Sequence, residues 1–216
     1  KFSKFDMGIT RILVKFGLVS FLSGALLSLS LLIVRTYIVE SNSLEAAGIW
    51  EAAYKISIYF NLLFLMPISI HYLPKFSAMD NFKKIDKEIK SIIKALIIPL
   101  LFIVFFTYLI ADSIVIFLFS ADFLLVNEIL VVVMIAEVFR IFGGIYVTSL
   151  LASQLFKQAI FPEFGFAVIF IGHVIFQSLS QLNLLDVALS YLLATIIYFL
   201  LSLSIHYISY KKGAHE

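Results

Sequence analysis

Six long runs of apolar residues, separated by mostly short polar stretches, dominate the chain. They lie at about residues 16–39, 49–71, 95–117, 128–151, 161–179 and 187–208. A helix needs about 20 apolar residues to cross the hydrocarbon of a bilayer, whereas strands of a membrane barrel alternate apolar and polar residues over about 10 positions. The run ALIIPLLFIVFFTYLI, which starts at Ala95, shows no such alternation. The pattern therefore predicts an all-α membrane protein with six transmembrane helices.

The polar stretch between the second and third runs is longer than the others. Within residues 75–94, apolar residues recur at the spacing of one helical face, with lysines between them, at Phe82, Ile85, Ile89, Ile92 and Ile93. This pattern predicts an amphipathic helix that lies on the inner leaflet and runs into the third span. Its lysines are either a topology signal or a site for anionic lipid or substrate phosphate.

The composition indicates that lipid is the main solvent of this chain. Of the 216 residues, 62% are hydrophobic and 14% are charged, whereas soluble domains have roughly 45–50% apolar and about 25% charged residues. The absence of cysteine excludes disulfides and thiol chemistry. The net charge of +2 gives no indication of nucleic-acid binding, and we expect no nucleic-acid partner.

The distribution of basic residues predicts how the spans are oriented. Lysines and arginines cluster before the first span and after the second, fourth and sixth, at Lys1, Lys4, Arg11 and Lys15, at Lys75, Lys83, Lys84, Lys87, Lys90 and Lys94, at Lys157, and at Lys211 and Lys212. The other connecting segments contain no Lys or Arg, and their charged residues are all acidic, namely Glu40, Glu45, Asp122 and Asp186. Because cytoplasmic loops are enriched in Lys and Arg, we expect residues 75–94 and both termini in the cytoplasm. The chain begins at Lys1 rather than at a methionine, so we expect it to be a fragment.

Whereas Glu163 lies near the inner surface, three basic and four acidic residues fall in the outer half or the middle of the apolar runs or at their outer ends. They are Arg35, Lys55, Arg140, Glu51, Asp112, Glu128 and Glu137. A charge at the bilayer centre costs at least about 2.5–3.5 kcal/mol on insertion scales, so such side chains usually pair with one another or face a watery cavity. These residues are therefore the candidate functional residues, except that Glu128 is expected in a loop.

Two of these acids each have a base about one helical turn away. Glu51 and Lys55 are four residues apart, and Glu137 and Arg140 are three apart, so each pair shares a helical face. Further polar residues on the broad side of the first pair are Tyr54, Ser57 and Asn61. Each pair either neutralises itself and joins helices together, or lines a hydrophilic transport cavity.

The remaining polar residues in the spans have simpler alternatives. Arg35 and Asp112 either extend to the headgroups or line the same cavity. His173 is either a packing residue or a proton carrier. Kinks or close helix contacts are expected at Pro67, Pro99 and the Gly143–Gly144 pair.

Motifs of enzyme chemistry are missing from the sequence. There is no HExxH, no GxSxG, no phosphate-binding loop and no metal-ligand spacing of Cys and His. The segments between the spans are too short for a soluble catalytic domain. We therefore expect no enzyme activity, no cofactor and no bound metal.

Two stretches of the chain resemble Wzx-type O-antigen flippases of the MATE-like exporter superfamily. The first, AAGIWEAAYKISIYFNLLFLMPISIHYLPKFS, matches at Gly48, Trp50, Lys55, Ile56, Ser57, Tyr72, Leu73, Pro74 and Ser77. The second, AEVFRIFGGIYVTSLLASQLFKQAIFPE, matches at Glu137, Arg140 and Glu163. The chain departs from the family pattern at four places. Ala136-Glu137 replaces the Gly-Asp of the family, and Arg140 replaces the commoner lysine. A glycine replaces the tryptophan expected just after that basic residue, and Glu51 replaces an uncharged amide.

The resemblance implies that these six spans are the C-terminal lobe of a twelve-helix transporter in the bacterial inner membrane. Such a protein flips an undecaprenyl-pyrophosphate-linked oligosaccharide to the outer leaflet by alternating access, with coupling to an ion gradient. The partners that it implies are the lipid-linked oligosaccharide, the lipid bilayer and the N-terminal lobe of the same protein. A polysaccharide polymerase is a further candidate partner.

Physical chemistry and the resemblance together assign roles to the charged residues. Those expected to contact phosphate or sugar are Lys55, Arg140, Arg35, Ser57 and Asn61, and those expected to couple to an ion are Glu51, Glu137 and Asp112. Two alternatives stay open. One is another exporter of the superfamily, with a drug or another lipid precursor as cargo. The other is a non-transporting membrane partner of polysaccharide synthesis, in which Lys55 and Arg140 would tolerate neutral substitution.

Overall fold

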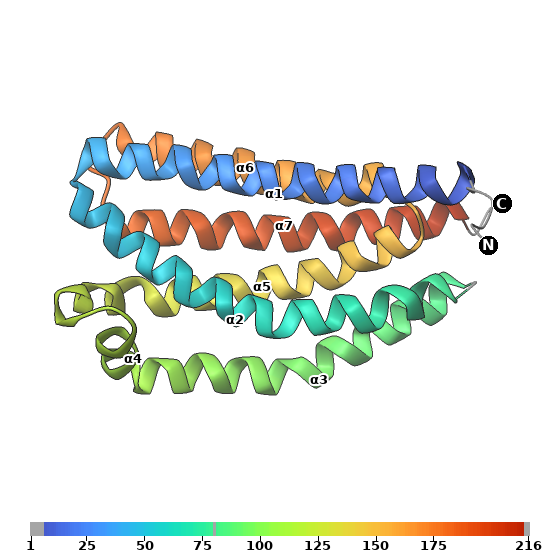
Figure 1. The fold of residues 1–216 in the computed structure, drawn as a ribbon, viewed down its shortest axis with the longest axis horizontal. Coiled ribbons are helices and arrows are strands. Elements are labelled where there is room, and N and C mark those ends of the chain that lie inside the picture. The colour runs from blue at the N-terminus through green and yellow to red at the C-terminus, as the bar shows by residue number, and fades with distance from the viewer. Residues whose placement is uncertain (1–6, 80, 214–216) are drawn as a thin grey trace, which may run out of the picture.

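The computed structural model describes residues 7–79 and 81–213, and every regular element within them is a helix (Figure 1). The elements are α1 (Met7–Ser41), α2 (Leu44–Ser77), α3 (Phe82–Leu109), α4 (Ala111–Leu118), the 3₁₀-helix η1 (Ala121–Val126), α5 (Asn127–Ala152), α6 (Phe156–Ser178) and α7 (Leu184–Gly213). In this part of the chain, six segments are long and apolar enough to cross a membrane, namely α1, α2, α3, η1 with α5, α6 and most of α7. The predicted fold class, an all-α multi-pass membrane protein with six spans, is confirmed.

The helices extend beyond the apolar runs that predicted them. α1 begins at Met7 rather than near residue 16, and α2 continues to Ser77 rather than ending near residue 71. The 35 residues of α1 correspond to about 52 Å at a rise of about 1.5 Å per residue, against about 30 Å of hydrocarbon. Hydropathy marks only the lipid-embedded part of a helix, whereas helical hydrogen bonding continues past it.

The amphipathic segment and the third span form one continuous helix, α3. Asn81 caps its start, because the Asn81 side chain accepts a hydrogen bond of 2.7 Å from the Lys83 amide. The predicted apolar face is buried at Ile85 and Ile89, and α3 lies against α5. The segment therefore differs from a helix lying on a leaflet, since protein covers its apolar face.

The third span ends earlier than the apolar run at 95–117 predicted. α3 stops at Leu109, and the chain then folds into the short helices α4 and η1. Asn127, the first residue of α5, donates a side-chain hydrogen bond to the carboxylate of Asp112 in α4. This contact ties α4 to the start of the next span, so the predicted third span is divided at Ile110.

α5 is the central helix of the bundle. It packs against α7, α2 and α3, while α6 packs on α7 and α1 packs on α6 (Figure 1). Most of α5 is buried, and little of α1 is. A Cβ atom on Gly143 would lie 2.5 Å from the ring of Tyr198, and one on Gly144 would lie 2.7 Å from Leu65. The two glycines thus allow α7 and α2 to approach α5 closely, as the sequence predicted.

The two ends of the bundle differ in charge. The start of α1, the end of α7 and the α2–α3 and α5–α6 turns lie at one end, which we call the basic end (Figure 1). The α1–α2 and α6–α7 turns lie at the opposite end, with Glu40, Glu45 and Asp186. Lys1 and Lys4, and the side chains of Lys211 and Lys212, lie outside the described residues. This arrangement is the one that the charge pattern predicts, and the cytoplasmic location of the basic end stays a prediction.

Candidate functional site

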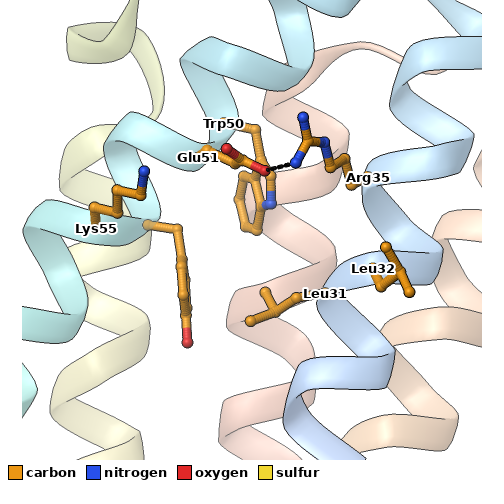
Figure 2. Close-up of a pocket in the computed structure, with 7 residues that line it drawn as sticks. Leu31, Leu32, Arg35, Trp50, Glu51 and Lys55 are labelled. Carbon is orange, nitrogen blue, oxygen red and sulfur yellow. Dashed lines mark ion pairs between the residues drawn. The ribbon is translucent and has the colours of Figure 1, made fainter.

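A pocket lies between α1 and α2 (Figure 2). Its residues belong to the last part of α1 and the first part of α2, so it is nearer the end opposite the basic end. Its volume is about 290 Å³, and it is lined by Leu31, Leu32, Arg35, Trp50, Glu51, Tyr54 and Lys55. Three of the charged residues singled out from the sequence are therefore neighbours in space. The rest of the lining consists of two leucines of α1 and two aromatic residues of α2. We call this site the α1–α2 pocket.

The ion pair in the α1–α2 pocket joins two helices. Arg35 Nη1 lies 2.7 Å from Glu51 Oε1, and Figure 2 shows the contact reaching from α1 to α2. The pairing of Glu51 with Lys55 that the sequence suggested is wrong. A spacing of four residues allows a contact between two side chains but does not ensure it. The planar guanidinium of Arg35, on the neighbouring helix, matches the shape of a carboxylate and pairs with Glu51 instead. Arg35 therefore lines the pocket, which is one of its two predicted roles.

Lys55 is the cation of the α1–α2 pocket that is left without a partner. Among the residues that the structure describes, no carboxylate lies within ion-pair distance of its amine, and its side chain is exposed. Two cations and one carboxylate give the lining a formal charge of +1. The pocket therefore offers a free amine to an anionic group.

A second polar site, the buried cluster, lies inside the bundle where α2, α5, α6 and α7 meet. It consists of Asn61, Glu137, Arg140, Glu163 and Tyr191. Glu137 of α5 has no exposed surface. Its Oε2 accepts a hydrogen bond of 2.7 Å from Nδ2 of Asn61 on α2, and its Oε1 accepts one from the hydroxyl of Tyr191 on α7. Neutral donors from two other helices thus hold this carboxylate.

Arg140 forms its ion pair with α6, so the predicted pair of Glu137 with Arg140 is wrong. Arg140 Nη2 lies 3.4 Å from Glu163 Oε2, and the guanidinium lies over the rings of Phe166, at 4.6 Å, and Tyr198, at 5.3 Å. Arg140 and Glu163 are each only 8% exposed, and Nη1 of Arg140 has no hydrogen-bond partner. With two carboxylates and one guanidinium, full ionisation leaves a buried negative charge, which is costly.

Tyr191 connects the pocket with the buried cluster. Its ring lies 5.8 Å from that of Trp50 and 6.0 Å from that of Tyr54, both of which line the pocket. Its hydroxyl donates to Glu137. Glu137 therefore lies directly behind the aromatic wall of the α1–α2 pocket, separated from it by one tyrosine.

Two residues predicted to contact substrate have partners within the bundle instead. Ser57 is fully buried and donates a hydrogen bond of 2.9 Å to the Tyr54 carbonyl of its own helix. Asn61 is 4% exposed and holds Glu137. Neither residue lines the α1–α2 pocket. A serine in an apolar helix readily bonds its own backbone, which removes it from the surface that a ligand could reach.

The other sequence candidates lie apart from both sites. Asp112 is exposed and accepts a hydrogen bond from Asn127. The prediction of a loop at Glu128 is wrong, because α5 begins at Asn127 and Glu128 is an exposed residue of its first turn. His173 Nδ1 lies 2.7 Å from the hydroxyl of Ser190, which joins α6 to α7. Within the described ranges, no group of three or more His, Cys, Asp or Glu side chains is placed to hold a metal ion.

Sequence reasoning missed the two tyrosines of α7 that face the charged residues. Tyr191 binds Glu137, and Tyr198 lies under Arg140 and beside Glu163. They are seven residues apart, so they share a helical face, and both are buried. A tyrosine within an apolar span is a usable signal, because its buried hydroxyl needs a hydrogen-bond partner.

No protein-family model, curated protein or solved structure matches the chain. The functional conclusion therefore depends on the chemistry of the two sites. The α1–α2 pocket can bind an anionic group through Lys55. The buried cluster can bind or release a proton at a carboxylate, because one negative charge is not balanced there.

Proposed function

We propose that this chain is one lobe of a membrane transporter that moves an anionic lipid-linked oligosaccharide, carried on undecaprenyl pyrophosphate, to the outer leaflet of the bacterial inner membrane. The observation that carries the proposal is Lys55, an amine without a carboxylate partner on the wall of a pocket in a membrane-spanning bundle. The cargo class follows from the resemblance to flippases, whose two matching stretches contain Lys55 and Arg140. The N-terminal lobe that would complete the transporter is part of the same proposal.

Charge favours a phosphate as the group that the α1–α2 pocket binds. A lysine binds phosphate oxygens as a compact point charge with three N–H donors. Arg35 is already neutralised by Glu51, yet a pyrophosphate with two negative charges competes for its guanidinium. Because half of the Arg35 side chain is exposed, at 47%, that exchange needs no unfolding. Arg35 and Lys55 together therefore form a two-point contact for a pyrophosphate.

The size of the α1–α2 pocket limits which part of the cargo it holds. Its volume of about 290 Å³ is at the lower edge of the range of roughly 300–1,000 Å³ typical of small-molecule sites. It suits a pyrophosphate or a single sugar rather than a whole oligosaccharide. We expect the other sugars to occupy space between the two lobes.

The buried cluster supports coupling of transport to a proton. When Glu137 is protonated, Arg140 and Glu163 balance one another and the cluster is neutral. When Glu137 is ionised, the cluster carries a negative charge that lies one tyrosine away from the pocket. An anionic cargo in the α1–α2 pocket repels this negative charge, so it raises the free-energy cost of ionising Glu137. Cargo binding and protonation of Glu137 therefore favour each other, and by linkage each strengthens the other equally.

The test uses the natural gene product that contains these residues, expressed in a strain that lacks its own copy. We expect Lys55→Gln to be inserted at normal abundance, to accumulate lipid-linked oligosaccharide and to lose surface polysaccharide. Lys55→Arg should keep most of the transport. Lys87→Gln is the matched control, because it removes one exposed lysine of the basic end that has no ion pair among the described residues.

Two results would overturn the proposal. Normal surface polysaccharide with Lys55→Gln would show that the lysine has no role in transport and would favour a non-transporting assembly partner. Accumulation of a different lipid precursor, or a change in drug sensitivity alone, would place the protein among the other exporters of the superfamily.

A further inference from the structure

A larger pocket lies at the basic end, between α1 and the start of α6. Its volume is about 460 Å³, and it is lined by Lys15, Leu18, Val19 and Leu22 of α1, Gln154 of the α5–α6 turn, and Phe156, Lys157, Gln158 and Ile160 of α6. None of the lining residues is acidic. We call this site the α1–α6 pocket.

The α1–α6 pocket has two amines that come from different helices. Lys15 and Lys157 are both exposed, and in the described part of the chain neither has an ion-pair partner. The lining therefore carries a formal charge of +2 with no carboxylate to offset it. The side-chain amides of Gln154 and Gln158 add hydrogen-bond donors at the same site. Such a set of groups is complementary to an anionic oxygen-rich headgroup.

The wall beside these amines is apolar and runs along one helix. Lys15, Leu18, Val19 and Leu22 follow the spacing i, i+3, i+4 and i+7, so they share one face of α1. α1 runs from the basic end toward the opposite end (Figure 1), so Leu18, Val19 and Leu22 lie progressively farther from the basic end than Lys15. An amine at the start of an apolar strip matches an amphiphile, with its charged headgroup at the lysine and its chain along the leucines.

The length of α1 places the α1–α6 pocket at the level of the lipid headgroups. Lys15 and Arg35 are 20 residues apart on this helix, which corresponds to about 30 Å. That distance equals the hydrocarbon thickness of a typical bilayer, about 30 Å. When Arg35 reaches one membrane surface, Lys15 therefore reaches the other. Lys157 is near the same level, because it lines the same pocket as Lys15.

The α5–α6 turn, which precedes Lys157, closes with a left-handed helix cap. α5 ends at Ala152 and α6 begins at Phe156. Between them, Gln154 has a φ of 59° and forms a left-handed cap of α5, because its amide and the next amide donate hydrogen bonds of 3.0 and 2.9 Å to carbonyls in the last turns of α5. Gln154 is one of the residues that line the pocket. The turn that caps α5 therefore also lines the pocket, and Lys157, the second residue of α6, follows directly after it.

We infer that the α1–α6 pocket binds one anionic phospholipid of the leaflet at the basic end. Its phosphate lies between Lys15 and Lys157, and an acyl chain lies along Leu18, Val19 and Leu22. The surrounding bilayer supplies this ligand at high concentration, so mass action fills the site. This inference does not rest on the proposed transport function, because it requires only a membrane that contains anionic phospholipid.

The experiment titrates the natural gene product, delipidated in detergent, with phosphatidylglycerol or with zwitterionic phosphatidylcholine, and counts bound lipids by native mass spectrometry. We expect one tight phosphatidylglycerol and no comparable phosphatidylcholine. The double variant Lys15→Gln/Lys157→Gln should bind phosphatidylglycerol roughly 30-fold more weakly, since each lysine near an anionic headgroup contributes about fivefold. Lys15→Arg/Lys157→Arg should bind normally, which separates loss of charge from misfolding.

The matched control is Lys87→Gln/Lys94→Gln, which removes two exposed lysines of the basic end that do not line the pocket. It should bind phosphatidylglycerol with unchanged affinity. An equal loss in both double variants would overturn the inference in favour of diffuse attraction to the basic end. Unchanged affinity of Lys15→Gln/Lys157→Gln would also overturn it, as would stronger competition by undecaprenyl pyrophosphate than by phosphatidylglycerol at equal concentration.

Discussion

Removal of one charge from the buried cluster should destabilise the bundle by an amount that depends on which charge is lost. Glu163→Gln removes the ion-pair partner of Arg140. The carboxylate of Glu137, about one helical turn from Arg140, still balances the charge of the guanidinium, so the cluster as a whole becomes neutral. Arg140→Gln leaves two carboxylates in a buried site with no base. We therefore expect Arg140→Gln to cost more stability than Glu163→Gln.

The geometry sets the size of this difference. Breaking a buried ion pair by removing one partner costs about 3–5 kcal/mol. Arg140 and Glu163 are joined by one contact of 3.4 Å, and the side-chain oxygen of a glutamine at position 163 can still accept a hydrogen bond from Arg140. Glu163→Gln should therefore cost about 1.5–3 kcal/mol, the range for a hydrogen bond to a charged group. Arg140→Gln also loses the contacts with two aromatic rings, so it should cost the full ~3–5 kcal/mol.

The assay is thermal unfolding in detergent, followed by the fluorescence of Trp50. This is the only tryptophan of the 216-residue chain, and it is buried against Tyr191 beside the cluster. A change of 1 kcal/mol shifts Tm by roughly 2–4 °C for a chain of this size, so the two variants should be clearly resolved. The double variant Arg140→Gln/Glu163→Gln should recover part of the loss caused by Arg140→Gln. Equal losses in the two single variants, or a larger one for Glu163→Gln, would refute this reading of the cluster.

Three further predictions concern packing, orientation and the surface ion pair. Gly143→Ala should lower Tm, because its Cβ would lie 2.5 Å from a tyrosine ring of α7, and overpacking costs about 1–3 kcal/mol; Gly24→Ala, with nothing within 4 Å of the new Cβ, is the control that should not lower it. A cysteine at Lys84 should resist an impermeant thiol reagent added to intact cells, whereas one at Asn42 should react, and these 216 residues contain no other cysteine; the opposite labelling would reverse the orientation. Glu51→Gln should change the free energy of unfolding by no more than about 1 kcal/mol, because its ion pair is 35–47% exposed, and a larger loss would show that the pair is structural.

The spans and their order were predictable because lipid imposes one simple requirement on the sequence. A helix that crosses hydrocarbon must be apolar over most of its length, and that pattern can be read without knowledge of any neighbour. The break at Ile110 was not predictable in this way, since residues 110–117 are as apolar as the helix before them. The apolar face at the start of α3 was likewise visible as a pattern, but the pattern could not show which helices α3 packs against.

The charged residues were predictable as sites, but their partners were not. A charge within a span indicates a pair or a cavity, and Arg35, Glu51 and Lys55 do line one pocket. Spacing along one helix cannot show which residue of another helix competes for the same carboxylate. For that reason Glu51 binds Arg35, and Arg140 binds Glu163, across helix interfaces that form only in the folded bundle.

The most direct test of the transport proposal is translocation of the cargo in proteoliposomes that contain the natural gene product. A fluorescent undecaprenyl-pyrophosphate-linked oligosaccharide is placed in both leaflets, and a membrane-impermeant quencher is added outside. With the native residue or with Lys55→Arg, quenching should continue until the lipid of the inner leaflet has also been reached. With Lys55→Gln it should stop once the outer leaflet is quenched. Quenching by Lys55→Gln that is as fast and as complete as that of the native protein would contradict the account.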